Sequence, residues 1–346
     1  MDSSKEILKK AVLWEPLNED KKIRCSLCSW RCTINDGKSG KCFVRKNTGG
    51  TLYSLNYYKV ISANPDPIEK KPLFHFLPGS KSFSIAAMGC NFRCEFCQNW
   101  QISQAAAEGG EIDGQAISPE VIIAAAKRDN CKSIAYTYTE PTVFMELCND
   151  CGRLAKEHGL ANVFVSNGFM TTEAIDFASE WLDGINIDIK AFSENFYKKL
   201  CKARLQPVLD TVSYIAKNTN IWMEITTLLI PGENDSEEEL KKLADFLVNS
   251  AGADVPWHIS RFYPQYKYLD SAPTPAESLE RALNIGQAAG LHYVYVGNVP
   301  GSKSENTFCW KCNRLLIERA GYRIIANNIK DSKCPNCMTE IAGFGL

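Results

Sequence analysis

Short β-rich runs alternate with amphipathic helical stretches between about residues 82 and 296, and this alternation sets the class of fold. Strands joined by helices form parallel sheets with right-handed crossovers. The expected strands are SFSIAAM (82–88), KSIAYTY (132–138), LANVFVS (160–166), INIDI (185–189), IWMEITTLLI (221–230), WHISRF (257–262) and HYVYV (292–296). Six or seven such units indicate a complete or partial α/β barrel, or an open doubly wound sheet.

Helix signals and composition shifts divide the chain into three parts. Ser118-Pro119 places an N-cap residue before a proline at the first helical position, and Ser236 with Glu239 makes a capping box. Residues 1–80 contain few helical signals, and residues 301–346 are built around two Cys-x-x-Cys pairs. We therefore expect an N-terminal Cys-rich module (1–80), a core (81–300) and a small C-terminal module (301–346).

The composition excludes several classes of protein. A chain of 346 residues with 45% hydrophobic residues can bury a core without disulfides, and its 15 cysteines are too few for a disulfide scaffold. A formal charge of -1 argues against a broad nucleic-acid footprint. The polar start MDSSKEILKK and the absence of a run of roughly 18 apolar residues predict neither a secretion signal nor a membrane span. We expect a cytoplasmic protein whose reduced cysteines are metal ligands or catalytic groups.

Most of the cysteines form three groups in the sequence. The groups are Cys25, Cys28, Cys32 and Cys42; Cys90, Cys94 and Cys97; and Cys309, Cys312, Cys334 and Cys337. The other four are Cys131, Cys148, Cys151 and Cys201, which we interpret as small buried hydrophobes.

The central group, Cys90-Asn-Phe-Arg-Cys94-Glu-Phe-Cys97, follows the first expected strand of the core. Three thiolates in one tight loop can ligate three irons of a [4Fe-4S] cluster and leave the fourth open to a substrate. By spacing alone, a structural zinc with a distant fourth ligand stays an alternative.

This loop resembles the signature of the radical S-adenosylmethionine (SAM) superfamily, with Phe96 before the last cysteine and Gln98-Asn99 after it. The resemblance implies that the open iron chelates the amino and carboxylate groups of S-adenosylmethionine. One electron from the cluster would then cleave the sulfonium to methionine and a 5′-deoxyadenosyl radical.

The resemblance extends over most of the chain. The stretches that carry it are DPIEKKPLFHFLPGS (66–80), GCNFRCEFCQNWQIS (89–103), YTYTEPT (136–142), VSNGF (165–169), IDIKAF (187–192), LLIPGEND (228–235) and VGNVPG (296–301). They resemble the AmmeMemoRadiSam-system radical SAM enzymes, a group related to the pyruvate formate-lyase activating enzymes. The implied fold is a partial (β/α)6 TIM-like radical SAM barrel with small Cys-rich N- and C-terminal modules.

The same resemblance implies roles for single residues. Cys90, Cys94 and Cys97 match the cluster ligands. The positions that match contacts to S-adenosylmethionine are Asn99, Glu140, Ser166, Asn167, Asp188, Lys190 and His258. The activases' Gly-Gly-Glu motif falls at Tyr138-Thr139-Glu140, so its glycines are absent here.

The two outer cysteine groups have the spacing of metal sites. Cys309-x2-Cys312-x21-Cys334-x2-Cys337 predicts a zinc-ribbon or rubredoxin-like site, with zinc preferred over mononuclear iron. Asn313 and Met338 follow its two knuckles, where positive φ angles are common, and methionine tolerates such an angle poorly. Cys25-x2-Cys28-x3-Cys32-x9-Cys42 predicts either a second zinc or an auxiliary iron–sulfur cluster for electron delivery or substrate binding.

Three hypotheses of function follow. The preferred one is a radical SAM oxidoreductase that abstracts hydrogen from a small-molecule or protein substrate, with a low-potential electron donor of the flavodoxin or ferredoxin type. The second is a glycyl-radical-enzyme activating enzyme. The third, a non-catalytic zinc-ribbon binding protein, leaves the central cysteines without a purpose. The loops near 101–111 and 263–268 are expected to contact the substrate but carry no diagnostic motif.

Overall fold

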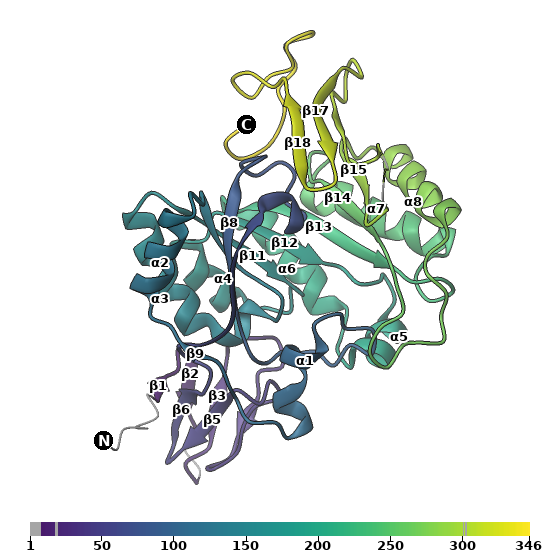
Figure 1. The fold of residues 1–346 in the computed structure, drawn as a ribbon. Helices are drawn as coiled ribbons and strands as arrows, with labels where there is room; N and C mark the ends of the chain where they lie inside the picture. Colours follow the sequence, from purple (N-terminus) through teal and green to yellow (C-terminus); the bar gives the residue numbers. More distant parts are fainter. Residues whose placement is uncertain (1–7, 18–19, 300, 302) are drawn as a thin grey trace.

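The computed structural model describes residues 8–17, 20–299, 301 and 303–346, and its centre is a nine-stranded sheet (Figure 1). In spatial order the strands are β15 (Val294–Gly297), β14 (Trp257–Arg261), β13 (Trp222–Leu229), β12 (Gly184–Asp188), β11 (Ala161–Ser166), β10 (Ser133–Tyr136), β8 (Lys81–Ala87), β7 (Lys59–Pro67) and β9 (Gln115–Ala116). All seven strands expected from the sequence are confirmed.

The pairing of these strands decides between the two architectures. Strand β8 and strands β10 to β15 pair in parallel in the order of the chain, whereas β7 pairs antiparallel with β8 and with β9. A doubly wound sheet would reverse its strand order at a switch point, and no reversal occurs. The two edge strands, β15 and β9, do not pair with each other, so the sheet is a partial α/β barrel.

Helices between successive parallel strands cover the outer face of the sheet (Figure 1). The longer ones are α2 (Pro119–Arg128), α3 (Met145–Glu157), α4 (Thr172–Ser179), α6 (Gln206–Asn218), α7 (Glu237–Ala251) and α8 (Ala276–Ala288). Short segments are α1 (Trp100–Ser103), α5 (Glu194–Phe196), a π-helical turn (Tyr197–Cys201) and 3-10 turns at Ile68–Lys70, Ala105–Glu108 and Pro141–Phe144. Half of the expected capping box is present: Ser236 Oγ accepts the N–H of Glu239 at 3.3 Å, whereas the Glu239 carboxylate accepts the N–H of Phe192 at 2.6 Å and not that of Ser236. Among the described residues no helix is long and apolar enough to cross a membrane.

The hydrophobic core lies between this sheet and its helices. Trp181 packs edge-on against Tyr136 and Phe164, with ring centroids 5.8 and 5.6 Å apart, and all three side chains are fully buried. Cys131, Cys148 and Cys151 are also buried, as expected of small hydrophobic side chains. All fifteen cysteines are free thiols.

Two small β structures lie at opposite ends of the barrel in the view of Figure 1. The N-terminal one contains β1 (Lys9–Lys10), β2 (Trp14–Pro16), β3 (Ile23–Cys25), β4 (Thr33–Ile34), β5 (Arg45–Thr48) and β6 (Thr51–Ser54). The C-terminal one contains β16 (Thr307–Phe308), β17 (Leu315–Ala320) and β18 (Arg323–Asn327). Strand β7 lies inside the expected module 1–80 but belongs to the barrel sheet. Residues 1–7 at the start of that module, and 300 and 302 around the expected 300/301 boundary, lie outside the described residues.

Candidate active site

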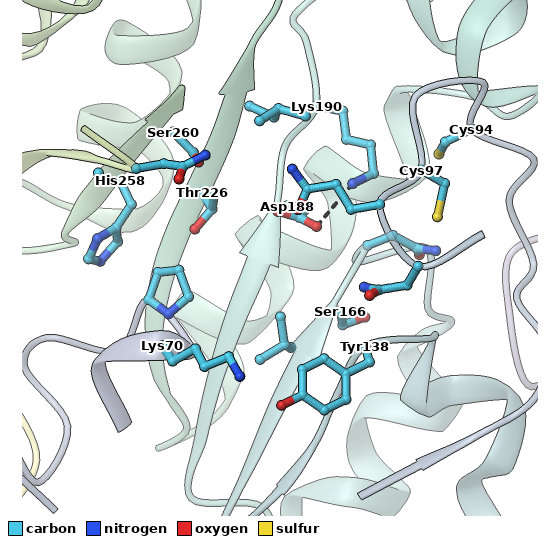
Figure 2. Close-up of a pocket in the computed structure, with 18 of the residues that line it drawn as sticks. Lys70, Cys94, Cys97, Tyr138, Ser166, Asp188, Lys190, Thr226, His258 and Ser260 are labelled. Atoms are coloured by element: carbon cyan, nitrogen blue, oxygen red, sulfur yellow. Dashed lines mark hydrogen bonds and ion pairs between the residues drawn. The ribbon is translucent and has the colours of Figure 1, made fainter. Parts of the chain in front are cut away.

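A cavity of about 360 Å³ lies at the carboxyl ends of the barrel strands, where α/β barrels carry their chemistry (Figure 2). The sequence-derived candidates for the cluster and for S-adenosylmethionine all line it: Cys90, Cys94, Cys97, Asn99, Glu140, Ser166, Asn167, Asp188, Lys190 and His258. These residues span 169 positions of the chain, and the barrel brings them together because the ends of parallel strands meet at one edge.

The cysteine loop is held tightly against the N-terminal module. Gly89 precedes it with φ 109°, and a Cβ at this position would lie 2.6 Å from a methyl carbon of Val44. The Arg93 guanidinium donates from Nη1 to the carbonyl of Cys90 at 2.7 Å and from Nη2 to the carbonyl of Lys41 at 2.6 Å. The loop therefore needs glycine at its start and gains its shape from Arg93.

The three thiols are protonated unless a metal binds them. Burial raises the pKa of Cys90 and Cys97, and the pKa of Cys94 is raised by a hydrogen bond with Cys201 and by burial. Cysteine binds a metal as the thiolate, so each thiol must release its proton when the metal binds, and the charge of the metal supplies the driving force. Cys201, which we expected to be only a small hydrophobe, thus lies against a candidate cluster ligand.

Glu140 organises the next layer of the site. Its buried carboxylate accepts the Ser166 hydroxyl at 2.8 Å through Oε1 and the backbone N–H of Asn167 at 2.8 Å through Oε2. Burial raises the pKa of Glu140. The Asn167 amide in turn lies 3.8 Å from the Sγ of Cys90. A single carboxylate therefore holds two further candidate residues at the cavity wall.

Asp188 and Lys190 form an ion pair beside the cysteine loop, with Nζ 2.9 Å from Oδ2 (Figure 2). Burial opposes the charge of Lys190, but Asp188 raises its pKa well above the ordinary value. Lys190 is therefore a permanent cation at the cavity wall, suited to a carboxylate ligand.

His258 is held by a buried carboxylate that the sequence analysis missed. Its Nε2 lies 2.7 Å from Glu224, which also accepts the backbone N–H groups of Phe74 and His75 at 2.9 and 2.8 Å. Burial opposes ionisation of Glu224, but its bond to His258 lowers its pKa overall. The sequence signal for this buried carboxylate is the position of a glutamate inside the apolar run IWMEITTLLI.

A second cluster that the sequence analysis missed includes Lys70 and Tyr138, which line the cavity away from Cys94 and Cys97 (Figure 2). Lys70 and Lys71 each place Nζ 2.8 Å from the carboxylate of Asp66, and the Tyr138 hydroxyl donates to the same carboxylate. Tyr138 has φ 67°, a left-handed angle at a position where the activases have glycine. The available sequence signal is an aspartate close to two lysines in DPIEKK, although Asp66 lies at the end of β7 and Lys70 in the 3-10 turn that follows it.

Two segments outside the barrel strands complete the surroundings. Tyr322 and Glu305 of the C-terminal module line the cavity, although the sequence placed them in a separate unit. The loops near 101–111 and 263–268 lie against each other, because the Tyr266 hydroxyl donates to Glu108 at 2.6 Å, and Ser103 and Gln104 of the first loop also line the cavity.

The cavity fits a [4Fe-4S] cluster with S-adenosylmethionine. Its volume is in the range of small-molecule sites. The Thr226 hydroxyl lines it, is buried and has no protein partner, which is the arrangement expected of a group reserved for a ligand. Cys90, Cys94 and Cys97 supply thiolates, and Lys190 supplies a cation, so the donor set suits both groups.

The C-terminal cysteines form a compact metal site. Cys309 and Cys337 have their Sγ atoms 3.5 Å apart, Cys312 and Cys334 have theirs 3.6 Å apart, and all four atoms lie within 4.8 Å of one another. Tetrahedral zinc with Zn–S bonds of about 2.3 Å separates its sulfurs by about 3.8 Å. Hydrogen bonds from Thr339 lower the pKa of Cys337 to about 6, which favours the thiolate. These four residues can therefore bind one metal ion.

Both knuckles of this site turn through positive φ angles. Asn313 has φ 57° and Met338 has φ 59°. The backbone N–H groups of these residues donate to the carbonyls of Cys309 and Cys334 at 2.8 and 2.9 Å. The expectation of a positive φ at both positions is confirmed.

The N-terminal cysteines, Cys25, Cys28, Cys32 and Cys42, line one small cavity between their own module and Val143 of the barrel. The structure thus brings these four together too, although more loosely than the C-terminal four.

The similarity of this chain to known proteins agrees with the structure of its core. Residues 85–246 match the radical SAM superfamily. The uncharacterized protein MJ0808 of Methanocaldococcus jannaschii is 45% identical over 336 residues, which cover 96% of this chain and 99% of the relative. The putative glycyl-radical enzyme activating enzyme MJ1632 of the same organism is 29% identical, over 64% of this chain and 80% of its own length.

Among solved structures, a radical SAM methyltransferase from Sphaerobacter thermophilus aligns with a TM-score of 0.51 at 17% identity. The alignment covers 64% of this chain and 67% of the methyltransferase, and it supports the fold alone. The barrel, the cysteine loop at its carboxyl edge and these similarities together show that the chain belongs to the radical SAM superfamily, whose members catalyse radical chemistry.

Proposed function

We propose that this radical SAM enzyme is an oxidoreductase that abstracts a hydrogen atom from a small-molecule or protein substrate. The observation that supports this most is the convergence of three thiols, a partly buried cation and a hydrogen-bonded carboxylate on one cavity. When bound to Cys90, Cys94 and Cys97, the [4Fe-4S] cluster supplies the electron that cleaves S-adenosylmethionine to methionine and a 5′-deoxyadenosyl radical.

The protein's own residues bind and orient the cofactor in this proposal. Lys190, held by Asp188, pairs with the methionine carboxylate. Glu140 accepts from the ammonium group and positions Ser166 and Asn167 for the ribose and methionine moieties. Asn99 contacts S-adenosylmethionine next to the loop, and His258 packs near the adenosine.

The far wall of the cavity is the proposed substrate side. Lys70 and Tyr138 line it opposite the cysteines, and Tyr322 and Glu305 of the C-terminal module line the same cavity. A substrate held there would face the radical while these side chains exclude water.

Anaerobic reconstitution with iron and sulfide tests the proposal. We expect cluster absorbance near about 400 nm and formation of 5′-deoxyadenosine on reduction with S-adenosylmethionine. Cys94→Ala should abolish 5′-deoxyadenosine formation, whereas the control Cys131→Ala, at a buried position outside the cavity, should retain it. Formation of 5′-deoxyadenosine by the Cys94 variant would show that the ligands are assigned wrongly.

A glycyl-radical-enzyme activating enzyme is the second candidate function. Two relatives carry that name, and the chain covers 80% and 84% of their lengths at 29% and 24% identity. Incubation with a glycyl-radical enzyme and S-adenosylmethionine should then produce a glycyl signal in electron paramagnetic resonance. Absence of the signal while 5′-deoxyadenosine still forms would favour the first candidate. The third hypothesis, a non-catalytic binding module, is wrong because the chain belongs to an enzyme superfamily.

The remaining assignments are proposals of the same kind. We propose zinc, rather than mononuclear iron, at Cys309, Cys312, Cys334 and Cys337. We also propose a flavodoxin- or ferredoxin-type electron donor, a cytoplasmic location and the division into units 1–80, 81–300 and 301–346. Metal analysis separates zinc from iron at the C-terminal site.

A further inference from the structure

The cavity lined by Cys25, Cys28, Cys32 and Cys42 takes no part in the proposed reaction. We propose that these four thiolates bind a second [4Fe-4S] cluster, which delivers electrons to the cluster at Cys90, Cys94 and Cys97. The second cluster stands on the geometry of its own cavity, whereas its role in electron delivery rests on the proposed function.

The spacing of the thiols favours a cluster over zinc. Among the described residues, the C-terminal four are the one group of three or more metal-ligand side chains whose donor atoms all lie within 4.8 Å of one another. The N-terminal four line a common cavity without meeting that limit, and so do the three cysteines of the radical SAM loop. Because tetrahedral zinc draws its sulfurs to about 3.8 Å, the wider arrangement fits a centre of several metal ions.

Arg45 supplies a second, independent observation. Its side chain lines the same cavity and is 1% exposed. Nη1 lies 2.8 Å from Glu146 and Nη2 donates to the carbonyl of Val12, but the buried Nε has no partner. A buried N–H donor without a partner is costly, and a sulfur of a bound cluster would satisfy it.

The N-terminal cavity is connected to the radical SAM loop by direct contacts. Trp30 lines the cavity, and its Nε1 donates at 2.8 Å to the carbonyl of Asn91, the residue after Cys90. Arg93, within the loop, donates to the carbonyl of Lys41, the residue before Cys42. The first contact therefore reaches the residue after Cys90, and the second reaches the residue before Cys42, so the two candidate cluster sites are joined through the neighbours of their ligands.

The ligand count decides the role. Four cysteines ligate all four irons of a cubane, so no iron is left open for a substrate. The contacts of Trp30 and Arg93 between this site and the radical SAM loop favour outer-sphere electron transfer over a purely structural role. A low-potential flavodoxin or ferredoxin gives one electron to the second cluster and is itself oxidised by one electron. The second cluster then returns to its 2+ state as the first is reduced from 2+ to 1+.

Metal content of the full chain tests the second cluster without reference to activity. After anaerobic reconstitution we expect about eight irons, about eight sulfides and one zinc per wild-type chain. The variant Cys90→Ala/Cys94→Ala/Cys97→Ala should retain about four irons and four sulfides. Adding Cys28→Ser and Cys32→Ser to this triple variant should remove the remaining irons and sulfides.

About four irons and two zincs in the wild type would overturn the second cluster. The metal content of the wild type tests the second cluster even if a multiple variant does not fold. The result does not depend on whether 5′-deoxyadenosine forms. The two proposals therefore fail separately.

Electron delivery is tested in Cys28→Ser/Cys32→Ser, which keeps the radical SAM loop intact. Freeze-quench electron paramagnetic resonance follows reduction of the remaining cluster. With a reduced flavodoxin as donor we expect the rate to fall at least about tenfold, whereas reduction by the small reagent dithionite should be unchanged. Equal rates with flavodoxin in the wild type and the variant would overturn the relay, and Cys131→Ser serves as the matched control.

Discussion

The backbone N–H of Asn167 donates to Oε2 of Glu140 at 2.8 Å, and this bond joins the ends of two neighbouring strands at the cavity. The Asn167 side chain lies 3.8 Å from the Sγ of Cys90. A fully buried carboxylate is thus separated from a candidate cluster ligand by one residue. Glu140 is in a position to act on S-adenosylmethionine directly and to fix the residues around it.

Glu140→Gln should weaken binding of S-adenosylmethionine at least about tenfold. The new amide brings an N–H group toward donors that now face the carboxylate, and it removes the charge that would pair with an ammonium. Equilibrium dialysis of the reconstituted protein measures the dissociation constant, with iron content as a check on the cluster. The control is Glu238→Gln, on the exposed face of α7; unchanged affinity in the Glu140 variant would contradict its assignment.

Lys190→Met should also weaken binding of S-adenosylmethionine, by about ten- to a hundredfold, because a charge-assisted hydrogen bond between a partly buried cation and a carboxylate contributes roughly 1.5–3 kcal/mol. Lys190→Arg should restore part of the affinity. Lys198→Met, on an exposed turn nearby, is the matched control. If Met and Arg at position 190 bind equally well, the charge of Lys190 has no role in binding.

Acid should destabilise the fold through His75, which joins the barrel to the C-terminal module. Its ring is fully buried, with Nδ1 2.7 Å from the carbonyl of Ala342 and Nε2 2.6 Å from the Tyr295 hydroxyl. Burial lowers the pKa of His75 to about 4. Between about pH 6.5 and 4 the unfolded chain binds a proton at this site that the folded chain does not bind, so stability falls as the pH falls.

The expected loss at pH 5 is about 2 kcal/mol relative to pH 7. Thermal unfolding of the wild type and of His75→Gln at both pH values measures it, because the variant lacks the titrating ring. The wild type should lose more stability on acidification than the variant. An equal loss in both proteins would show that His75 does not carry the effect.

Cys312→Ser should remove one zinc per chain and loosen the C-terminal module. The site loses one of its four ligands, and metal binding supplies folding energy in small modules of this kind. Because Tyr322 and Glu305 of this module line the main cavity, binding of S-adenosylmethionine or substrate should weaken as well. Zinc content and the dissociation constant of S-adenosylmethionine are measured on the same sample. Unchanged affinity in a protein without this zinc would show that the C-terminal module does not contribute to binding.

Met338→Gly should stabilise the C-terminal module by up to about 1 kcal/mol. Methionine here adopts φ 59°, which strains a residue with a Cβ, and its side chain is 66% exposed, so little packing is lost. The reciprocal variant Asn313→Met should destabilise the module at the equivalent position of the other knuckle. Resistance to zinc chelators reports both effects, and a loss of resistance in Met338→Gly would contradict the prediction.

Local features of the sequence determined the strands of the barrel and the positions of the candidate metal ligands. Alternation of β-rich and helical segments is visible within windows of a few residues, so all seven strands were predicted near their observed bounds. The spacing of Cys90, Cys94 and Cys97 within one loop is equally local, as is that of Cys309 with Cys312. Such patterns depend only on residues that are close together in the chain, so they are visible in the sequence.

Contacts between distant residues were decided by the tertiary structure alone. Glu224 meets His258 across 34 positions, and Cys201 reaches Cys94 from the far end of the segment after β12. Tyr322 lines a cavity built mainly by the barrel, and the four N-terminal thiols line one small cavity. Each of these relationships arises from how strands and modules pack in space, and burial then sets the charge states, which no local pattern encodes.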